Sequence, residues 1–275
     1  MPTSVSQLLK GKKGVIMGVA NDRSIAWTAA EAASRAGARL AFTYQNHAME
    51  RRVVPLAESV GAEITVPCDV AEDAEIDYAF DVIAKHWESI DFVVHAIAFS
   101  DRNELKGRYV DASKENMLNS LLVSCYSFTR VAQRAANMAN FGASLVTYTF
   151  EGSRHVVPSY NVMGVAKAAL EQSVRYLAAD LGSSGIRVNA VSSGPMRTLS
   201  GAAIGAGRAI HRWARENSAL RRDLEVKDVA STSLYLLSEL SAGVTGEVHH
   251  VDNGNNIVGV TPRGRSSPSS NGNHV

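Results

Sequence analysis

Tyr160 and Lys167 are the two residues whose types and spacing suggest chemistry most directly. A phenol can donate a hydrogen bond to an oxygen that gains negative charge, and a nearby ammonium favours that charge. Seven residues separate them in a pattern that predicts a helix over residues 160–181, and residues i and i+7 share a helix face. The Lys167 side chain should lean back towards the Tyr160 hydroxyl. Taken singly, a packed aromatic and a solvated amine are the simpler interpretations.

A glycine turn leads into a helix directly after the first predicted strand. Gly18 would let the backbone approach a phosphate, and Ser24 and Ile25 would present N–H groups at the positive end of the helix dipole. This arrangement suits a dinucleotide pyrophosphate. Because the fuller G-x-G-x-x-G pattern is absent, an ordinary N-cap after a turn stays open as the alternative.

Polar residues follow the second and third predicted strands. Gln45 stands where an acidic residue ordinarily binds the adenosine ribose, and its amide can bond the hydroxyls without a charge. This favours NADH, although Arg51 and Arg52 keep NADPH open. At the end of the third strand, beside Val70, the Asp69 carboxylate could accept a hydrogen bond from the adenine amino group; a helix N-cap is the alternative role.

The elements that must position these residues alternate along the chain as short β-branched runs and longer helical patterns, which predicts a parallel sheet covered by helices. Strands are predicted at residues 14–18, 39–44, 63–68, 91–98, 144–149, 186–191 and 247–251. Helices are predicted at residues 24–36, 49–60, 74–87, 113–138, 160–181 and 226–238. Right-handed crossovers wind the strands outward in both directions from the centre, leaving a crevice at their carboxyl ends for cofactor and substrate.

The expected fold class is therefore α/β: a single Rossmann-type doubly wound domain over residues 1–260, with a seven-stranded parallel sheet flanked by helices. Residues 199–218 interrupt the pattern with Gly, Ala and three arginines, which predicts a mobile lid. Residues 261–275 are rich in Ser, Gly, Asn and Pro and predict a disordered tail, because they cannot bury enough apolar area to become ordered.

Composition narrows the classes of partner. The chain has 275 residues, 45% of them hydrophobic, and 28 basic against 27 acidic side chains, so no net charge favours nucleic acid or an anionic membrane. Cys68 and Cys125 lie in apolar segments, as reduced thiols of a core do, which argues against a disulfide scaffold or a metal site. No apolar run is long enough to span a bilayer or to begin a secretion signal. We expect a cytoplasmic protein that binds no metal, nucleic acid or membrane.

Several strings are more specific than this fold requires: Gly18-Val-Ala before Ser24-Ile-Ala, and residues 41–46 (AFTYQN), 68–73 (CDVAED) and 160–168 (YNVMGVAKA). They resemble the bacterial NADH-dependent enoyl-[acyl-carrier-protein] reductases of the divergent short-chain dehydrogenase/reductase type, notably the alphaproteobacterial forms, over about residues 11–254. Carbonyl-reducing members of the superfamily carry their tyrosine where this chain has Met163 and an upstream serine where it has Phe150. A ketoreductase is therefore disfavoured.

The resemblance implies NADH-dependent reduction of trans-2-enoyl thioesters in fatty-acid biosynthesis, with Tyr160 bonding the thioester oxygen and Lys167 holding the nicotinamide ribose. The further residues that it places beside NADH are Ile97, Met196, Thr198, Leu199 and Ser200. The residues that it places against the acyl thioester, besides Tyr160, are Phe99, Ser100 and Phe150. It also implies a homotetramer and an acidic acyl-carrier protein as partner, which Arg208 of the lid could meet; a solvated arginine is the alternative there.

Three positions depart from that family. Phe150 stands where a second tyrosine is usual, Glu151 where a small or apolar residue is usual, and Ala98 where glycine is common. Tyr148 should share a strand face with Phe150 without taking its place. Two alternatives to the enoyl reductase therefore remain open: another hydride-transferring short-chain enzyme, and a cofactor-binding paralogue with little catalytic activity.

Overall fold

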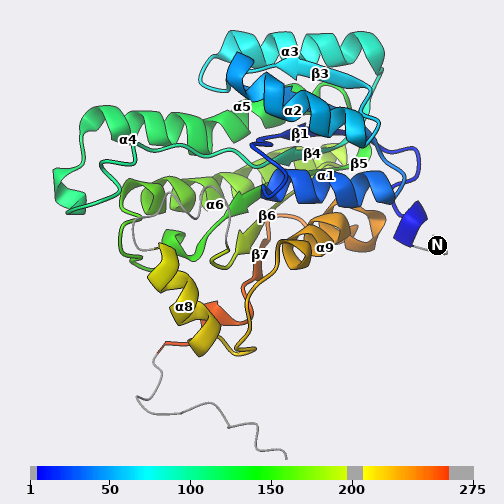
Figure 1. Cartoon of the computed structure of the whole chain (residues 1–275). Coiled ribbons are helices and arrows are strands. Elements are labelled where there is room, and N and C mark those ends of the chain that lie inside the picture. The colour runs from blue at the N-terminus through cyan, green and yellow to red at the C-terminus, as the bar shows by residue number, and fades with distance from the viewer. Residues whose placement is uncertain (1–4, 197–206, 260–275) are drawn as a thin grey trace, which may run out of the picture.

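The computed structural model describes residues 5–196 and 207–259, and a seven-stranded parallel sheet runs through its centre (Figure 1). The strands are β1 (Lys13–Met17), β2 (Arg39–Tyr44), β3 (Ile64–Pro67), β4 (Ile90–His95), β5 (Ala139–Thr149), β6 (Arg187–Ser193) and β7 (Val248–Val251). Their order is β3-β2-β1-β4-β5-β6-β7, and every neighbouring pair is parallel. The predicted doubly wound sheet is confirmed, and the direction of winding reverses between β1 and β4.

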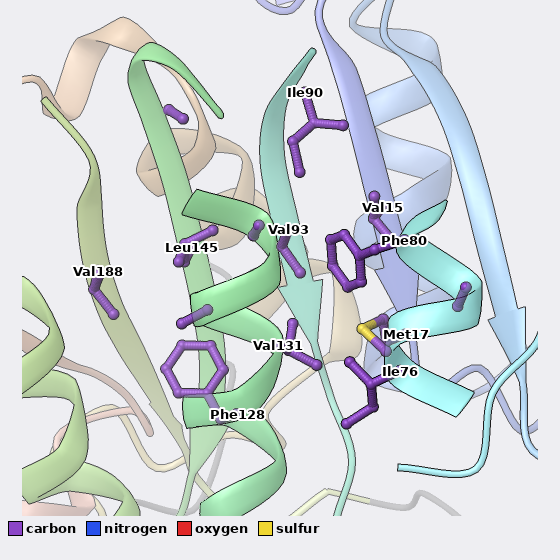
Figure 2. Packing of buried hydrophobic residues seen from close by; sticks show 14 of the residues in the cluster. Val15, Met17, Ile76, Phe80, Ile90, Val93, Phe128, Val131, Leu145 and Val188 are labelled. Carbon is purple, nitrogen blue, oxygen red and sulfur yellow. The ribbon is translucent and has the colours of Figure 1, made fainter. Parts of the chain in front are cut away.

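Helices cover both faces of the sheet (Figure 1). One layer consists of α1 (Ile25–Arg35), α2 (His47–Ser59) and α9 (Val226–Leu237). The other consists of α3 (Asp73–His86), α5 (Ser127–Ala136) and α6 (Val162–Leu181). Alternate strand residues supply the two cores because side chains alternate across a sheet: Val15 and Met17 face α3, as Figure 2 shows, while Ile16 packs in the opposite layer.

The predicted helix over residues 113–138 is divided into three parts. These are α4 (Lys114–Leu121), a π-helical turn η3 (Leu122–Tyr126) and α5. Three serines within this segment, Ser120, Ser124 and Ser127, are buried. The Ser127 hydroxyl donates to the Val123 carbonyl at 2.7 Å, and a hydrogen bond of this kind commonly bends a helix. Single π-turns within helices are frequent at functional sites.

Two strands differ from their predicted ranges by three or more residues at one end. β5 begins at Ala139, which pairs with Ile90 across a register shift; its first residues are half-buried or exposed and carry no alternating apolar pattern. β4 ends at His95, because the chain leaves the sheet after Ala96 donates to the Met17 carbonyl at 3.0 Å. Residues 96–100 are thereby free to line the end of the sheet.

The predicted lid lies partly, and the predicted tail wholly, outside the described residues. Of residues 199–218 the structure describes those from Gly207, which form α8 (Gly207–Asn217) and the turn after it. The predicted tail, residues 261–275, lies outside the described part. Within the described part, none of the helices combines the length and apolarity needed to cross a bilayer.

Candidate active site

Gly18 lies where the carboxyl ends of β1 and β4 approach each other. Its φ is 96°, a conformation that favours glycine. A Cβ at this position would lie 2.2 Å from the Ala96 carbonyl oxygen and 3.0 Å from Ile97 Cγ1. The glycine is therefore required by this close approach, and it brings two predicted cofactor residues, Gly18 and Ile97, side by side. A bare backbone at this edge fits the approach of a dinucleotide phosphate.

Ser24 occupies the N-cap position of α1 but turns back into the preceding loop. Its hydroxyl donates to the Asn21 carbonyl at 2.7 Å, and its backbone N–H donates to the same carbonyl at 3.2 Å. The Ser24 N–H is thus engaged within the turn, which corrects the expectation that it is presented at the helix start. Ile25 is the first residue of α1, at the positive end of the helix dipole.

The two polar residues predicted at the adenosine end are hydrogen-bonded to each other. Gln45 Nε2 donates to Asp69 Oδ2 at 3.0 Å, while Asp69 Oδ1 accepts from the Ala71 N–H at 3.0 Å. Asp69 is not a helix N-cap, because α3 begins at Asp73, so that alternative is wrong. The neighbouring Val70 side chain is buried in the core.

Tyr160 lies in a turn before α6, at the same end of the sheet. The helix begins at Val162, and the backbone of Ser159 and Asn161 has positive φ on either side of Tyr160. The expectation that Tyr160 and Lys167 share one helix two turns apart is therefore wrong. Strained backbone of this kind persists where surrounding contacts fix it, and here Asn161 Nδ2 donates to the Glu104 carbonyl at 3.1 Å.

The Tyr160 ring is packed on several sides. Its centroid lies 5.0 Å from that of Phe150, edge to face at 67°, and Leu105 and Met163 complete the cluster. Met163 fills the position of the carbonyl reductases' tyrosine with an apolar side chain. Burial, and then the charge of Glu171, raise the pKa of the Tyr160 phenol well above its usual value, so the phenol is neutral and can donate.

Lys167 is buried on α6 and directed at the end of β5. It is 6% exposed, and its Nζ donates to the Tyr148 carbonyl at 2.7 Å. Burial lowers the pKa of its ammonium to about 8, while Cys125 and Glu171 act in the opposite direction. Since this pKa lies above neutral pH, the ammonium is still charged there.

Tyr148 and Phe150 do not share a face, contrary to expectation. The Tyr148 hydroxyl lies 2.8 Å from Ser233 Oγ of α9, in the opposite core layer. β5 ends at Thr149, so the alternation of side chains does not continue to Phe150. Phe150 instead packs against Tyr160, which leaves no second hydroxyl from β5 beside that ring.

The predicted acyl-binding segment is held by η3. The Phe99 N–H donates to Ser124 Oγ at 3.0 Å, and the Phe99 ring is 49% exposed. The Ser100 hydroxyl, by contrast, donates to Asn116 Oδ1 at 3.2 Å and points into the protein. Phe99 is therefore placed to meet a ligand with its side chain, whereas the Ser100 hydroxyl has an internal partner. Ala98, between Ile97 and this segment, is exposed.

Two buried groups near Lys167 were missed by the sequence reasoning. Glu171 is 5% exposed and accepts from Thr149 Oγ1 at 2.7 Å; its position one helical turn after Lys167 was the available signal. His95 is fully buried at the end of β4, 3.0 Å from Ser127 Oγ. Burial, and then Lys167, lower the pKa of His95 to about 3, so it is neutral.

The remaining predicted residues lie at or beyond the last described residue of this region. Met196 is buried. Thr198, Leu199 and Ser200 and the Arg208 side chain lie outside the described residues. Within residues 5–196 and 207–259, no group of three or more His, Cys, Asp or Glu side chains is arranged to hold a metal ion.

Known proteins share this chain's sequence and fold. Residues 18–256 match a family model described as Enoyl-(Acyl carrier protein) reductase. The chain is 55% identical, over 91% of its length and 94% of the relative's, to Enoyl-[acyl-carrier-protein] reductase [NADH] 2 of Rhizobium meliloti. The Anaplasma phagocytophilum enoyl-(acyl-carrier-protein) reductase, solved in complex with NAD, is 52% identical with a TM-score of 0.89, covering 94% of this chain and 96% of that one.

A third comparison bears on the cofactor. The Bacillus cereus enoyl-acyl carrier protein reductase, solved with NADP⁺ and indole naphthyridinone, is 46% identical with a TM-score of 0.90. The match covers 92% of this chain and 100% of that one. Relatives of this chain have thus been solved with either nicotinamide dinucleotide.

Proposed function

Because this chain belongs to the enoyl-[acyl-carrier-protein] reductase family, we propose that Tyr160 and Lys167 carry its reaction. The chain is an NADH-dependent oxidoreductase that reduces enoyl thioesters in fatty-acid biosynthesis. The observation that carries the assignment of Tyr160 is its burial as a neutral phenol at the carboxyl end of the sheet.

NADH, when bound, supplies the hydride that reduces C3 of the enoyl group, and C2 of the resulting enolate then takes up a proton. The Tyr160 hydroxyl donates to the thioester oxygen as that oxygen gains enolate charge, a contact whose loss typically costs about 10²–10³ in rate. Lys167 exchanges its bond to the Tyr148 carbonyl for the ribose hydroxyls, and its positive charge favours the enolate. The cluster around Tyr160 excludes water from that oxygen, which strengthens both contacts.

The proposed NADH site extends from these two residues along the carboxyl ends of the strands. Gly18 and Ile25 would meet the pyrophosphate, Ile97 the ribose, and Gln45 with Asp69 the adenosine. To these we add the remaining predicted cofactor residues: Val70, Met196, Thr198, Leu199 and Ser200. The close approach at Gly18 supports this placement, because no side chain intervenes between the backbone and a phosphate. Phe99, Ser100 and Phe150 are proposed to line the acyl thioester.

The proposal is tested by following NADH absorbance with a crotonyl thioester. Turnover with the enoyl substrate and none with a ketoacyl thioester is the expected result. Turnover of the ketoacyl substrate alone would identify another short-chain enzyme. Tight NADH binding without turnover of either would identify the paralogue with little activity, in which the Phe150 ring against Tyr160 would be the first position to revert to tyrosine.

We further propose a homotetramer and carrier-protein docking through α8. Exposed apolar side chains lie on α4, η3 and α6 and support self-association: Leu118, Tyr126, Val165 and Tyr176. Arg212 and Arg215 are exposed on α8 and would attract an acidic carrier together with Arg208. Light scattering tests the tetramer. A single domain over residues 1–260 and a cytoplasmic location also remain predictions.

A further inference from the structure

Glu171 is a buried carboxylate to which the proposed reaction gives no role. It lies on α6 and is 5% exposed. Oε1 accepts hydrogen bonds from Thr149 Oγ1 at 2.7 Å and from Ser153 Oγ at 2.5 Å. Moving a carboxylate out of water costs free energy unless the carboxylate is hydrogen-bonded, and these two hydroxyls are its hydrogen-bond donors.

Glu171 and Lys167 are held against neighbouring residues at the end of β5. Lys167 Nζ bonds the Tyr148 carbonyl, and Glu171 bonds the Thr149 hydroxyl. Residues four apart lie on the same side of a helix, so an anion and a cation stand next to each other. No direct salt bridge joins them among the described side chains, and the carboxylate therefore acts on the ammonium through a buried, weakly screening environment.

Among the other ionisable groups around Lys167, the Cys125 thiol also raises the pKa of Lys167, and more strongly than Glu171, but none of these groups is a second carboxylate. They are His95 of β4, which is neutral, the Cys125 thiol of η3 and the neutral Tyr160 phenol. Glu151, on the 3₁₀ turn η4 (Glu151–Ser153), instead bonds Asn255 and His155. Glu171 is thus the carboxylate that opposes the effect of burial on Lys167.

The same carboxylate anchors η4, which lies behind Tyr160. A Cβ at Gly152 would lie 2.4 Å from Tyr160 Cδ1, and one at Gly164 would lie 2.6 Å from the Gly152 carbonyl oxygen. The turn is therefore closely packed between the Tyr160 ring and the first part of α6. The hydrogen bond from Ser153 to Glu171 holds the last residue of η4 in place.

We propose that Glu171 is a positioning residue of this reductase: its charge keeps Lys167 protonated where it meets the NADH ribose, and its bond to Ser153 fixes the turn that supports Tyr160. The inference rests on the roles proposed above for Lys167 and Tyr160. It predicts that NADH affinity, and not turnover alone, depends on the carboxylate.

The test measures NADH affinity by fluorescence across neutral and alkaline pH in the full chain. Wild-type affinity should fall as pH rises through the pKa of Lys167, about 8, because the neutral amine holds the ribose less well. In Glu171→Gln this fall should move to lower pH by about one unit or more, the effect of removing a nearby opposite charge. Glu151→Gln is the matched control and should leave it in place.

A second pair of variants separates charge from packing. Arginine stays protonated throughout this pH range, so Lys167→Arg should abolish the fall of NADH affinity at alkaline pH. Adding Glu171→Gln to Lys167→Arg should not restore that fall. Glu171→Asp keeps the charge but reaches less far towards Ser153. In this variant NADH affinity should fall at the same pH as in wild type, while kcat should be lower. Glu171→Asp also provides the test if Glu171→Gln does not fold.

The outcomes distinguish the role of Glu171 from that of Lys167. The charge role of Glu171 would be overturned if NADH affinity in a folded Glu171→Gln protein fell at the same pH as in wild type. It would also be overturned if that pH changed in Glu171→Asp. Either result would leave Lys167 assigned to NADH. If the wild-type protein itself shows no alkaline fall in NADH affinity, the Lys167 assignment is wrong and the inference fails with it.

Discussion

Replacing Tyr160 with phenylalanine should separate catalysis from both cofactor binding and folding. The Tyr160 hydroxyl forms no hydrogen bond with any other described residue, while the ring beneath it is 7% exposed and packs against Phe150. Tyr160→Phe removes the hydroxyl and keeps the ring. We therefore expect the free energy of unfolding to change by less than about 0.5 kcal/mol.

The kinetic effect should be far larger than the effect on stability. Loss of one donor to a developing oxyanion typically costs about 10²–10³ in kcat, or roughly 3–4 kcal/mol of transition-state stabilisation. NADH affinity should stay within about threefold of wild type, which corresponds to less than about 1 kcal/mol. The assays are NADH oxidation with a crotonyl thioester, NADH fluorescence and thermal unfolding.

Tyr148→Phe is the matched control, because it removes the same atom from another buried tyrosine, the last residue but one of β5. The Tyr148 hydroxyl bonds Ser233 in the opposite layer. Its loss should lower the free energy of unfolding by about 0.5–1.5 kcal/mol and leave kcat nearly unchanged. Retention of wild-type kcat by Tyr160→Phe, or an equal loss in both variants, would refute the assignment of the oxyanion donor to Tyr160.

Three further predictions concern binding. Gly18→Ala should abolish NADH binding, because the new Cβ would lie 2.2 Å from the Ala96 carbonyl oxygen; calorimetry showing unchanged affinity would contradict the placement of the pyrophosphate. NADH should give a higher kcat/KM than NADPH because the amide of Gln45 supplies no positive charge for a 2′-phosphate, and the reverse preference would redirect attention to the arginines of α2. Charge reversal of Arg212 and Arg215 should raise KM for a carrier-bound enoyl substrate and leave KM for the coenzyme A thioester unaltered; equal effects on both substrates would count against docking on α8.

The sheet could be predicted because its strands repeat one physical pattern. Buried runs such as residues 39–44, bounded by turns and separated by helical periods, predict a parallel sheet, and the right hand of its crossovers limits the possible strand orders to a few. Gly18 was found because a glycine directly after the first strand is where this fold brings two strand ends together. These features depend on local sequence and on general rules of chain topology.

The geometry of the site was harder to predict from the sequence because it depends on the residues at which helices begin and strands end. The strict spacing of Tyr160 and Lys167 suggested one helix, yet two positive-φ residues place Tyr160 in a turn before it. The end of β5 at Thr149 reverses the expected direction of Phe150 in the same way. Glu171 was overlooked because a glutamate in a helical pattern ordinarily faces solvent, and its burial becomes evident only when β5 and η4 are packed against α6.

The burial of Lys167 also bears on how this protein can be improved by selection. Its pKa falls from an ordinary value of 10.5 to about 8, so below about pH 8 the folded and unfolded chains are both charged and folding carries the full cost of burying the ammonium. That cost diminishes as the pH rises from about 8 to 10.5 and is gone above it. At neutral pH an apolar side chain at position 167 removes this cost together with the charge that the cofactor requires. A library ranked by melting temperature alone would thus be enriched in inactive variants at this position, and heat-stable variants of this enzyme have to be selected for turnover in the same round.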